Sequence, residues 1–102
     1  MAVQIDHVVA LSNAWSTGAQ KLSYAQRVQF ANDPLELLAV DGPTNQSKSD
    51  KDAANWLPRA AYRCAYVARQ IAVKRKYRFW VTATEKAAMS NVLATCPGFK
   101  LP

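Results

Sequence analysis

Short stretches of hydrophobic residues along the chain predict two strands. In residues 2–5, the β-branched Val3 and Ile5 lie on one face of an extended chain. Residues 37–40 form an apolar run that is bounded by turn residues on both sides. A short run in this setting predicts a second strand, which we expect to pair with the first in the antiparallel sense.

Helical spacing and capping patterns predict the helices. Ser23 and Thr82 are each followed three residues later by Gln or Glu, so both are expected to open a helix with a capping box. After the second strand, Thr44 is a good N-cap for a helix that begins near Asn45. The strongest helical pattern runs from residue 59 to about residue 77, where apolar residues recur every three or four positions.

The same patterns predict the core and the fold class. Residues 8–15 fit either a short helix or an irregular apolar segment. In the first of the two capped helices, Tyr24 and Val28 are expected to face inward. Three tryptophans are spaced as core anchors: Trp15, Trp56 and Trp80. Together these elements predict an α+β fold, in which a two-stranded antiparallel core is surrounded by several helices.

The totals of the sequence favour a single domain, residues 1–102. Half of the residues are hydrophobic, which is enough for one modest core in a chain of this length. No apolar run is long enough for a transmembrane helix, so we expect no membrane partner. Met1 lies only a few residues before the Asp6-His7 pair, so we expect a trimmed N-terminus, with any export signal outside this sequence.

Positive charge is concentrated in one segment. Residues 59–80 carry seven basic residues and no acidic one, which gives this segment a charge of +7. The whole chain has a net charge of +6, so the remainder has a net charge of −1. A one-sided basic element is typical of proteins that bind a polyanion such as nucleic acid. The alternative is a solvated helix face that only keeps the protein soluble.

The two cysteines are expected at the same level of two neighbouring helices. Cys64 lies about 16–17 residues before the turn between the last two helices, and Cys96 about 14–15 residues after it, so the arms are nearly equal at ~1.5 Å per residue. If these helices pack antiparallel, a disulfide is geometrically feasible. It would indicate an oxidising compartment. The alternative is two reduced, buried thiols.

Three polar residues fall where the predicted core would bring them together. Asp6 and His7, the only histidine, end the first strand, and Asn45 stands at the start of the helix after the second. Carboxylate and amide oxygens are suited to Mg²⁺ or Mn²⁺. A histidine can accept a proton from an attacking water near neutral pH. The combination indicates metal-assisted phosphodiester hydrolysis.

Three segments together resemble an HNH endonuclease of the ββα-metal type. They are Asp6-His7-Val8-Val9, Leu37-Leu38-Ala39-Val40 and Thr44-Asn45-Gln46-Ser47-Lys48-Ser49-Asp50-Lys51-Asp52, in the order and spacing of that family. Other segments are similar to small, often exported bacterial HNH proteins that are related to the C-terminal domain of GmrSD-type restriction enzymes: those around Trp15, Phe30 to Pro34, Trp56 to Pro58 and Tyr62 to Cys64. The resemblance covers nearly the whole chain. It implies a ββα-metal core and a secreted or extracytoplasmic location.

The resemblance also gives each motif residue a role. It implies that His7 is the general base and that Asp6 and Asn45 are the ligands of a single divalent metal ion. Mg²⁺ is the first candidate for this ion, and Mn²⁺ or another divalent ion is the alternative. The middle position of the motif is usually an Asn that ties the loop between the strands, and here it is Glu36. Glu36 would either hold this loop through its carboxylate or add a charge near the metal.

The leading hypothesis is therefore an HNH endonuclease that cuts DNA, with RNA as a further substrate, at low sequence specificity. Candidates for phosphate contacts are Lys48, Lys51, Arg59 and Arg63, and the alternative for each is a solvated surface position. A different interpretation, which Glu36 keeps open, is a nucleic-acid-binding module with a decayed nuclease centre. A third is a structural domain with a coincidental Asp-His pair. The sequence leaves the oligomeric state open.

Overall fold

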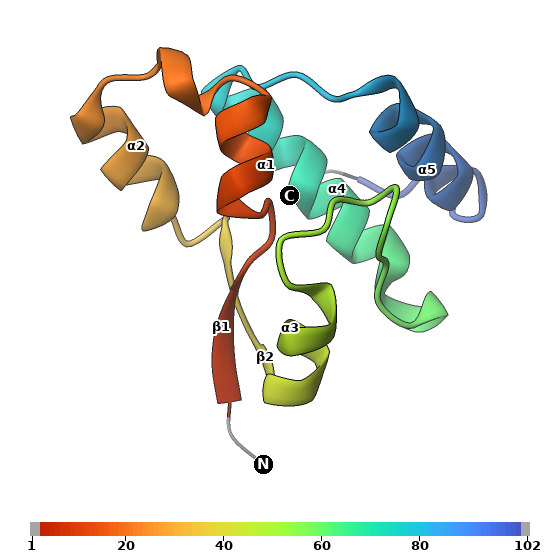
Figure 1. Cartoon of the computed structure of the whole chain (residues 1–102). Helices are drawn as coiled ribbons and strands as arrows, with labels where there is room; N and C mark the ends of the chain where they lie inside the picture. The colour runs from red at the N-terminus through yellow and green to blue at the C-terminus, as the bar shows by residue number, and fades with distance from the viewer. Residues whose placement is uncertain (1–2, 101–102) are drawn as a thin grey trace.

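The computed structural model describes residues 3–100 and has the predicted α+β fold (Figure 1). Its elements are β1 (Val3–His7), α1 (Leu11–Ser16), the 3-10 turn η1 (Ala19–Lys21), α2 (Tyr24–Ala31), β2 (Leu37–Asp41), α3 (Gly42–Lys48), α4 (Ala60–Tyr77) and α5 (Ala83–Ala94). β1 pairs antiparallel with β2, with Asp6 opposite Leu38. β1 extends two residues beyond the predicted end at Ile5 and ends at His7. The predicted first residue, Ala2, lies outside the described residues. Among residues 3–100, no helix is both long and apolar enough to cross a membrane.

Both predicted capping boxes are present. In α2, the Ser23 hydroxyl accepts a hydrogen bond from the N–H of Gln26, and the Gln26 side chain accepts one from the N–H of Ser23. Thr82 and Glu85 form the same reciprocal pair at the start of α5. Each box satisfies N–H groups that have no partner within the helix, and such a cap is worth roughly 1 kcal/mol.

α3 begins earlier than predicted, and its N-cap is Asp41 rather than Thr44. The Asp41 carboxylate accepts hydrogen bonds from the N–H of Thr44 at 2.9 Å and from its hydroxyl at 2.6 Å. These bonds hold the pKa of Asp41 below its usual range. Pro43 fits the first turn because that turn needs no N–H from it. Asn45 therefore lies inside α3 and not at its start.

α4 is shared by two hydrophobic clusters. The first gathers the N-terminal helices around Phe30, and the second lies between α4 and α5. Val73 of α4 belongs to the first cluster and Val67 to the second. Phe30 packs edge-to-face on Phe79, with ring centroids 5.0 Å apart. A single long helix thus supports both halves of the molecule (Figure 1).

The predicted inward face of α2 is wrong. Tyr24 is 75% exposed and Val28 is 42% exposed, whereas Phe30 is buried. α2 packs on the first cluster through its C-terminal end, at Phe30 and Ala31. Its first turn consequently stays in solvent.

Two of the three predicted tryptophan anchors are also wrong. Trp15 is 51% exposed and Trp80 is 44% exposed. Each indole is covered by a cation instead of by the core, with Arg27 over Trp15 and Lys21 over Trp80. Cation–π contacts of this kind retain solvent on one side of the ring. Only Trp56 is partly buried.

The basic segment is only partly a surface feature. Lys74 is buried, and its ammonium donates to Glu85 of α5 at 3.0 Å and to the Thr17 hydroxyl at 3.2 Å. Burial lowers the pKa of Lys74. Arg69 donates to the carbonyls of residues 34, 35 and 37, just before and within β2. Both cations hold elements together rather than facing a partner.

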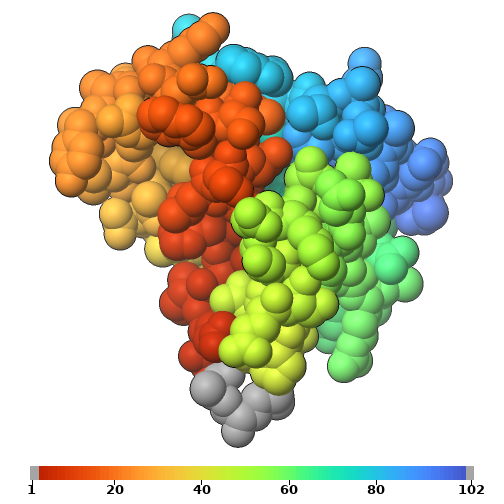
Figure 2. All heavy atoms as spheres, in the orientation of Figure 1, coloured from red at the N-terminus to blue at the C-terminus, as the bar shows by residue number. Residues whose placement is uncertain are grey.

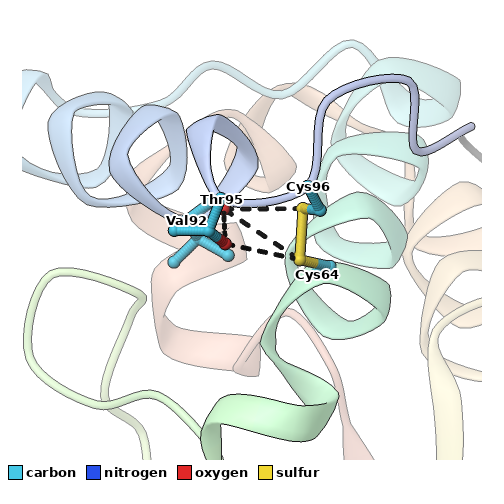
Figure 3. Close-up of a disulfide and its surroundings, with 4 residues drawn as sticks. All are labelled: Cys64, Val92, Thr95 and Cys96. Atoms are coloured by element: carbon cyan, nitrogen blue, oxygen red, sulfur yellow. Dashed lines mark hydrogen bonds between the residues drawn. A yellow bond between two sulfur atoms is a disulfide. The ribbon is translucent and has the colours of Figure 1, made fainter.

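Cys64 of α4 and Cys96, just after α5, form a disulfide (Figure 3). Their Cα atoms are 6.5 Å apart. The Lys74–Glu85 ion pair joins the opposite ends of the same two helices, so α4 and α5 run antiparallel. The predicted pairing is confirmed, because equal arms bring the two cysteines to one level.

Removing the disulfide should destabilise the protein. Reduction, or the double substitution Cys64→Ser and Cys96→Ser, should lower the free energy of unfolding by about 3–4 kcal/mol for a sequence separation of 32. Urea unfolding with and without reductant measures the difference. The double variant serves as the control, because reductant should not change its stability. Equal stability of the wild type in both conditions would contradict the expectation.

Candidate functional site

β1, α3 and the turn after β1 surround a small hollow of about 230 Å³. Asp6 and His7 reach it from the end of β1, and Asn45 reaches it from α3. β1 contacts α3, and Figure 2 shows the N-terminal segment (red) against the segment that follows β2 (yellow-green). The structure thus brings together the three residues that the sequence singles out.

Asp6 is buried, with 4% of its surface exposed, and both of its carboxylate oxygens have partners. Oδ1 accepts a hydrogen bond from the Lys48 ammonium at 2.9 Å. Oδ2 accepts one from the Tyr66 hydroxyl at 2.5 Å. Burial raises the pKa of Tyr66, and the hydrogen bond to Asp6 and the charge of that carboxylate raise it further. The phenol therefore remains a donor. Asp6 is therefore fixed from β1, α3 and α4 at once.

Lys48 does not face phosphates as predicted. It is 2% exposed, and its ammonium also donates to the backbone carbonyls of His7 and Val8. A buried cation needs such partners because its desolvation is costly. The last turn of α3 points this side chain toward β1, so Lys48 fastens the end of the strand instead of meeting a ligand.

His7 is half-buried, and one of its ring nitrogens is held by the fold. Nε2 lies 3.1 Å from the carbonyl oxygen of Ala31, at the end of α2. A carbonyl only accepts, so Nε2 must carry the hydrogen, and in the neutral ring Nδ1 is the proton acceptor. Within residues 3–100, no side chain or backbone group is hydrogen-bonded to Nδ1. This is the tautomer that a general base at the hollow requires.

Asp6 and Asn45 offer the oxygen types that a hard divalent cation takes, although few acidic groups gather here. Residues 3–100 contain no group of three or more His, Cys, Asp or Glu side chains that could hold a metal. A carboxylate offers about four lone-pair sites, and Lys48 and Tyr66 occupy two of those on Asp6. Asn45 donates to Gln4 at 2.9 Å, which leaves its amide oxygen available. Waters and phosphate oxygens would complete the shell.

Glu36 holds the turn that follows β1. It is fully buried, and Oε1 accepts a hydrogen bond from the N–H of Val9 at 2.6 Å, while its backbone carbonyl accepts one from Val8 at 2.8 Å. Oε2 is buried without a hydrogen-bond partner among the described residues. Burial raises the pKa of Glu36 to about 8, so the side chain is mostly a neutral acid at pH 7. It ties the loop without adding a full charge near Asp6.

Comparison with known proteins places the chain among nuclease domains. The profile of the family described as GmrSD restriction endonucleases, C-terminal domain, matches residues 1–92. The chain belongs to this family. An uncharacterized secreted protein of Arthroderma benhamiae is 44% identical over 97 residues, which cover 92% of this chain and 48% of that protein. The chain thus spans about half the length of this relative. No solved structure shows significant similarity to this chain.

Membership of this family relates the chain to the C-terminal domain of restriction endonucleases. Three of the predicted phosphate contacts, Lys51, Arg59 and Arg63, are exposed. Arg63 donates to the Pro58 carbonyl at 2.7 Å, which holds its guanidinium near the start of α4. These three cations are available to a polyanion, in contrast to Lys48.

Two residues that support the candidate site in this GmrSD-type domain are not predicted as site residues from the sequence: Tyr66 and Gln4. Tyr66 is buried against the candidate site and orients Asp6, and Gln4 binds the amide of Asn45. One signal was present for Tyr66, since a buried tyrosine on an apolar helix face needs a partner for its hydroxyl. No local signal marks Gln4, because its partner lies 41 residues away.

Glu36 should make stability depend on pH. Its pKa rises from 4.5 to about 8 on folding, so the folded state binds the proton more tightly than the unfolded chain. The contribution of Glu36 to the free energy of unfolding is therefore fully present below pH 4.5 and is lost as the pH rises to about 8. The loss is at most about 1.4 kcal/mol per pH unit. Urea unfolding across this range should show the slope in the wild type.

Glu36→Gln removes the titrating group and should flatten the slope. Asp50→Asn, which removes an exposed carboxylate, is the matched control and should retain it. The difference between the wild-type and variant curves isolates the contribution of Glu36, because every other group is the same in both proteins. Parallel curves for wild type and Glu36→Gln would refute the assignment.

Proposed function

We propose that this domain is a metal-dependent HNH endonuclease that hydrolyses phosphodiester bonds of DNA, with RNA as a further substrate, at low sequence specificity. The observation that carries the proposal is the hollow in which His7, Asp6 and Asn45 meet. Membership of a restriction-endonuclease family supports it independently. We expect low sequence specificity because the exposed cations would contact phosphates, and phosphate contacts carry no direct information about the base sequence.

His7 acts as the general base in this proposal. The Ala31 carbonyl fixes the ring through Nε2, so Nδ1 is free to accept a proton from a water that attacks phosphorus. The oxygen of that water forms the new bond to phosphorus as the bond to the leaving oxygen breaks. Fixing the ring through a backbone carbonyl, instead of a mobile side chain, keeps the proton acceptor in one orientation.

Asp6 and Asn45 would hold one divalent ion, with Mg²⁺ favoured by their hard oxygen ligands. When bound, such an ion supplies Lewis-acid stabilisation of the charge that develops on the phosphate oxygens. Lys48 and Tyr66 orient the Asp6 carboxylate from behind, as outer hydrogen-bond partners of metal ligands do. The positive charge of Lys48 also weakens the attraction of Asp6 for a cation, so we expect half-maximal activity only at a high metal concentration.

The second candidate function is a nucleic-acid-binding module with a decayed nuclease centre. Two observations favour it: Glu36 occupies the usual Asn position, and Lys48 is already paired with Asp6. Its exposed cations would bind the same polyanion without hydrolysis. The two functions differ in one property, which is metal-dependent cutting.

We also propose that the domain works outside the cytoplasm. The Cys64–Cys96 disulfide supports this because such bonds persist in oxidising compartments. The similar Arthroderma benhamiae protein is described as secreted.

Plasmid nicking tests the nuclease. The wild type should nick supercoiled DNA with Mg²⁺ or Mn²⁺ and not with EDTA. His7→Ala and Asn45→Ala should each lower the rate by about 100-fold or more, the scale of a lost general base or ligand. Asn91→Ala, an exposed position on α5, is the matched control and should cut normally. No metal-dependent nicking by the wild type would favour the binding module, and cutting by His7→Ala would exclude His7 as the base.

The salt dependence of binding tests the exposed cations. Joint substitution of Arg59 and Arg63 by Ala should reduce the slope of log affinity against log salt by about 2, because each lost phosphate contact contributes about 0.9 on duplex DNA. The control replaces Arg75 and Arg78, which are exposed at the other end of α4. Fluorescence anisotropy of labelled DNA in EDTA gives the slopes. An equal change in both variants would show only a general effect of net charge.

A further inference from the structure

A second cavity, of about 530 Å³, adjoins the hollow that contains His7. It lies between β2, α3 and the first half of α4, and it shares Asp6 and Asn45 with the smaller hollow. Its volume falls within the range of about 300–1,000 Å³ that is usual for small-molecule sites. The proposed hydrolysis does not require the rest of its lining.

Three aromatic residues line this cavity: Trp56, Tyr62 and Tyr66. Tyr66 is buried at 6% exposure, and Trp56 packs edge-to-face on it with ring centroids 5.9 Å apart. Tyr62 stands one turn before Tyr66 on the same face of α4 and is 62% exposed. The apolar residues 38–40 of β2 also line the cavity. A flat apolar ring can therefore enter between α4 and β2.

The charges around the cavity favour an anion beside that ring. Its ionised lining comprises three cations and two carboxylates: Lys48, Arg59, Arg69, Asp6 and Asp41. Lys48 neutralises Asp6 directly. Asp41 is engaged in capping α3, and Arg69 is engaged with backbone carbonyls. Arg59 is exposed at the start of α4, so it is the cation that can meet a ligand phosphate.

We propose that this cavity binds an unpaired nucleotide of the nucleic acid, with its base stacked on Tyr62 and its phosphate on Arg59. A base within a duplex is already stacked and paired, so it cannot enter without being flipped out. The domain therefore prefers single-stranded nucleic acid over duplex. This inference rests on the proposed function, because it places that nucleotide next to the phosphodiester at His7.

Binding in EDTA tests the cavity without hydrolysis. The probes are a fluorescein-labelled DNA strand of about ten nucleotides and the duplex of the same sequence. We expect the single strand to bind the wild type more tightly. Tyr62→Ala should weaken single-strand binding by about tenfold, the scale of one lost base–aromatic stack, and leave duplex binding unchanged. Tyr62→Phe keeps the ring and should bind like the wild type.

Tyr24→Ala is the matched control, because Tyr24 is also an exposed helical tyrosine and does not line the cavity. Unchanged thermal melting of Tyr62→Ala would show that its loss is local. Equal affinity for single strand and duplex, or no effect of Tyr62→Ala, would overturn the inference even if the plasmid is nicked. Tyr62-dependent binding without any nicking would instead overturn the nuclease and leave the nucleotide site in place.

Discussion

A buried ion pair between Asp6 and Lys48 determines the arrangement of the candidate site. Its two charges belong to β1 and α3, and Tyr66 adds a bond from α4, so three elements meet at one carboxylate. Removing one partner of such a pair typically costs about 3–5 kcal/mol, since the other charge stays buried and uncompensated. The relative position of His7 and Asn45 therefore depends on a lysine that takes no part in chemistry.

The turn after His7 is held from two further directions. Glu36, before β2, accepts hydrogen bonds from the backbone of Val8 and Val9, and Gln70 of α4 donates to the Val8 carbonyl at 2.9 Å. Every one of these partners is buried. The site is thus assembled by hydrogen bonds to the backbone of one short turn, and one of the acceptors is an acid that stays mostly protonated at pH 7.

Local signals in the sequence predict most of the fold. The capping boxes at Ser23 and Thr82 and the two apolar strands depend on neighbouring residues only. The cysteine pairing depends on one further regularity, which is the equal length of two helical arms that meet in a turn. Burial of a charge is different: Lys48 looks like a surface residue until Asp6, 42 positions earlier, is placed beside it. Asp41 and Thr44 are both good caps, and only the geometry of the strand end selects Asp41.

α4 serves three environments along one helix. Val73 packs in the first hydrophobic cluster, Val67 in the second, and Tyr66 against Asp6, whereas His7 and Asn45 belong to neither cluster. Different parts of the molecule should therefore tolerate substitutions to different degrees. The outer helices can exchange core residues within their own cluster while the hollow keeps its shape. Each buried position of α4 belongs to one of these three environments, so almost any substitution on its buried faces disturbs one of them, and we expect this helix to evolve most slowly.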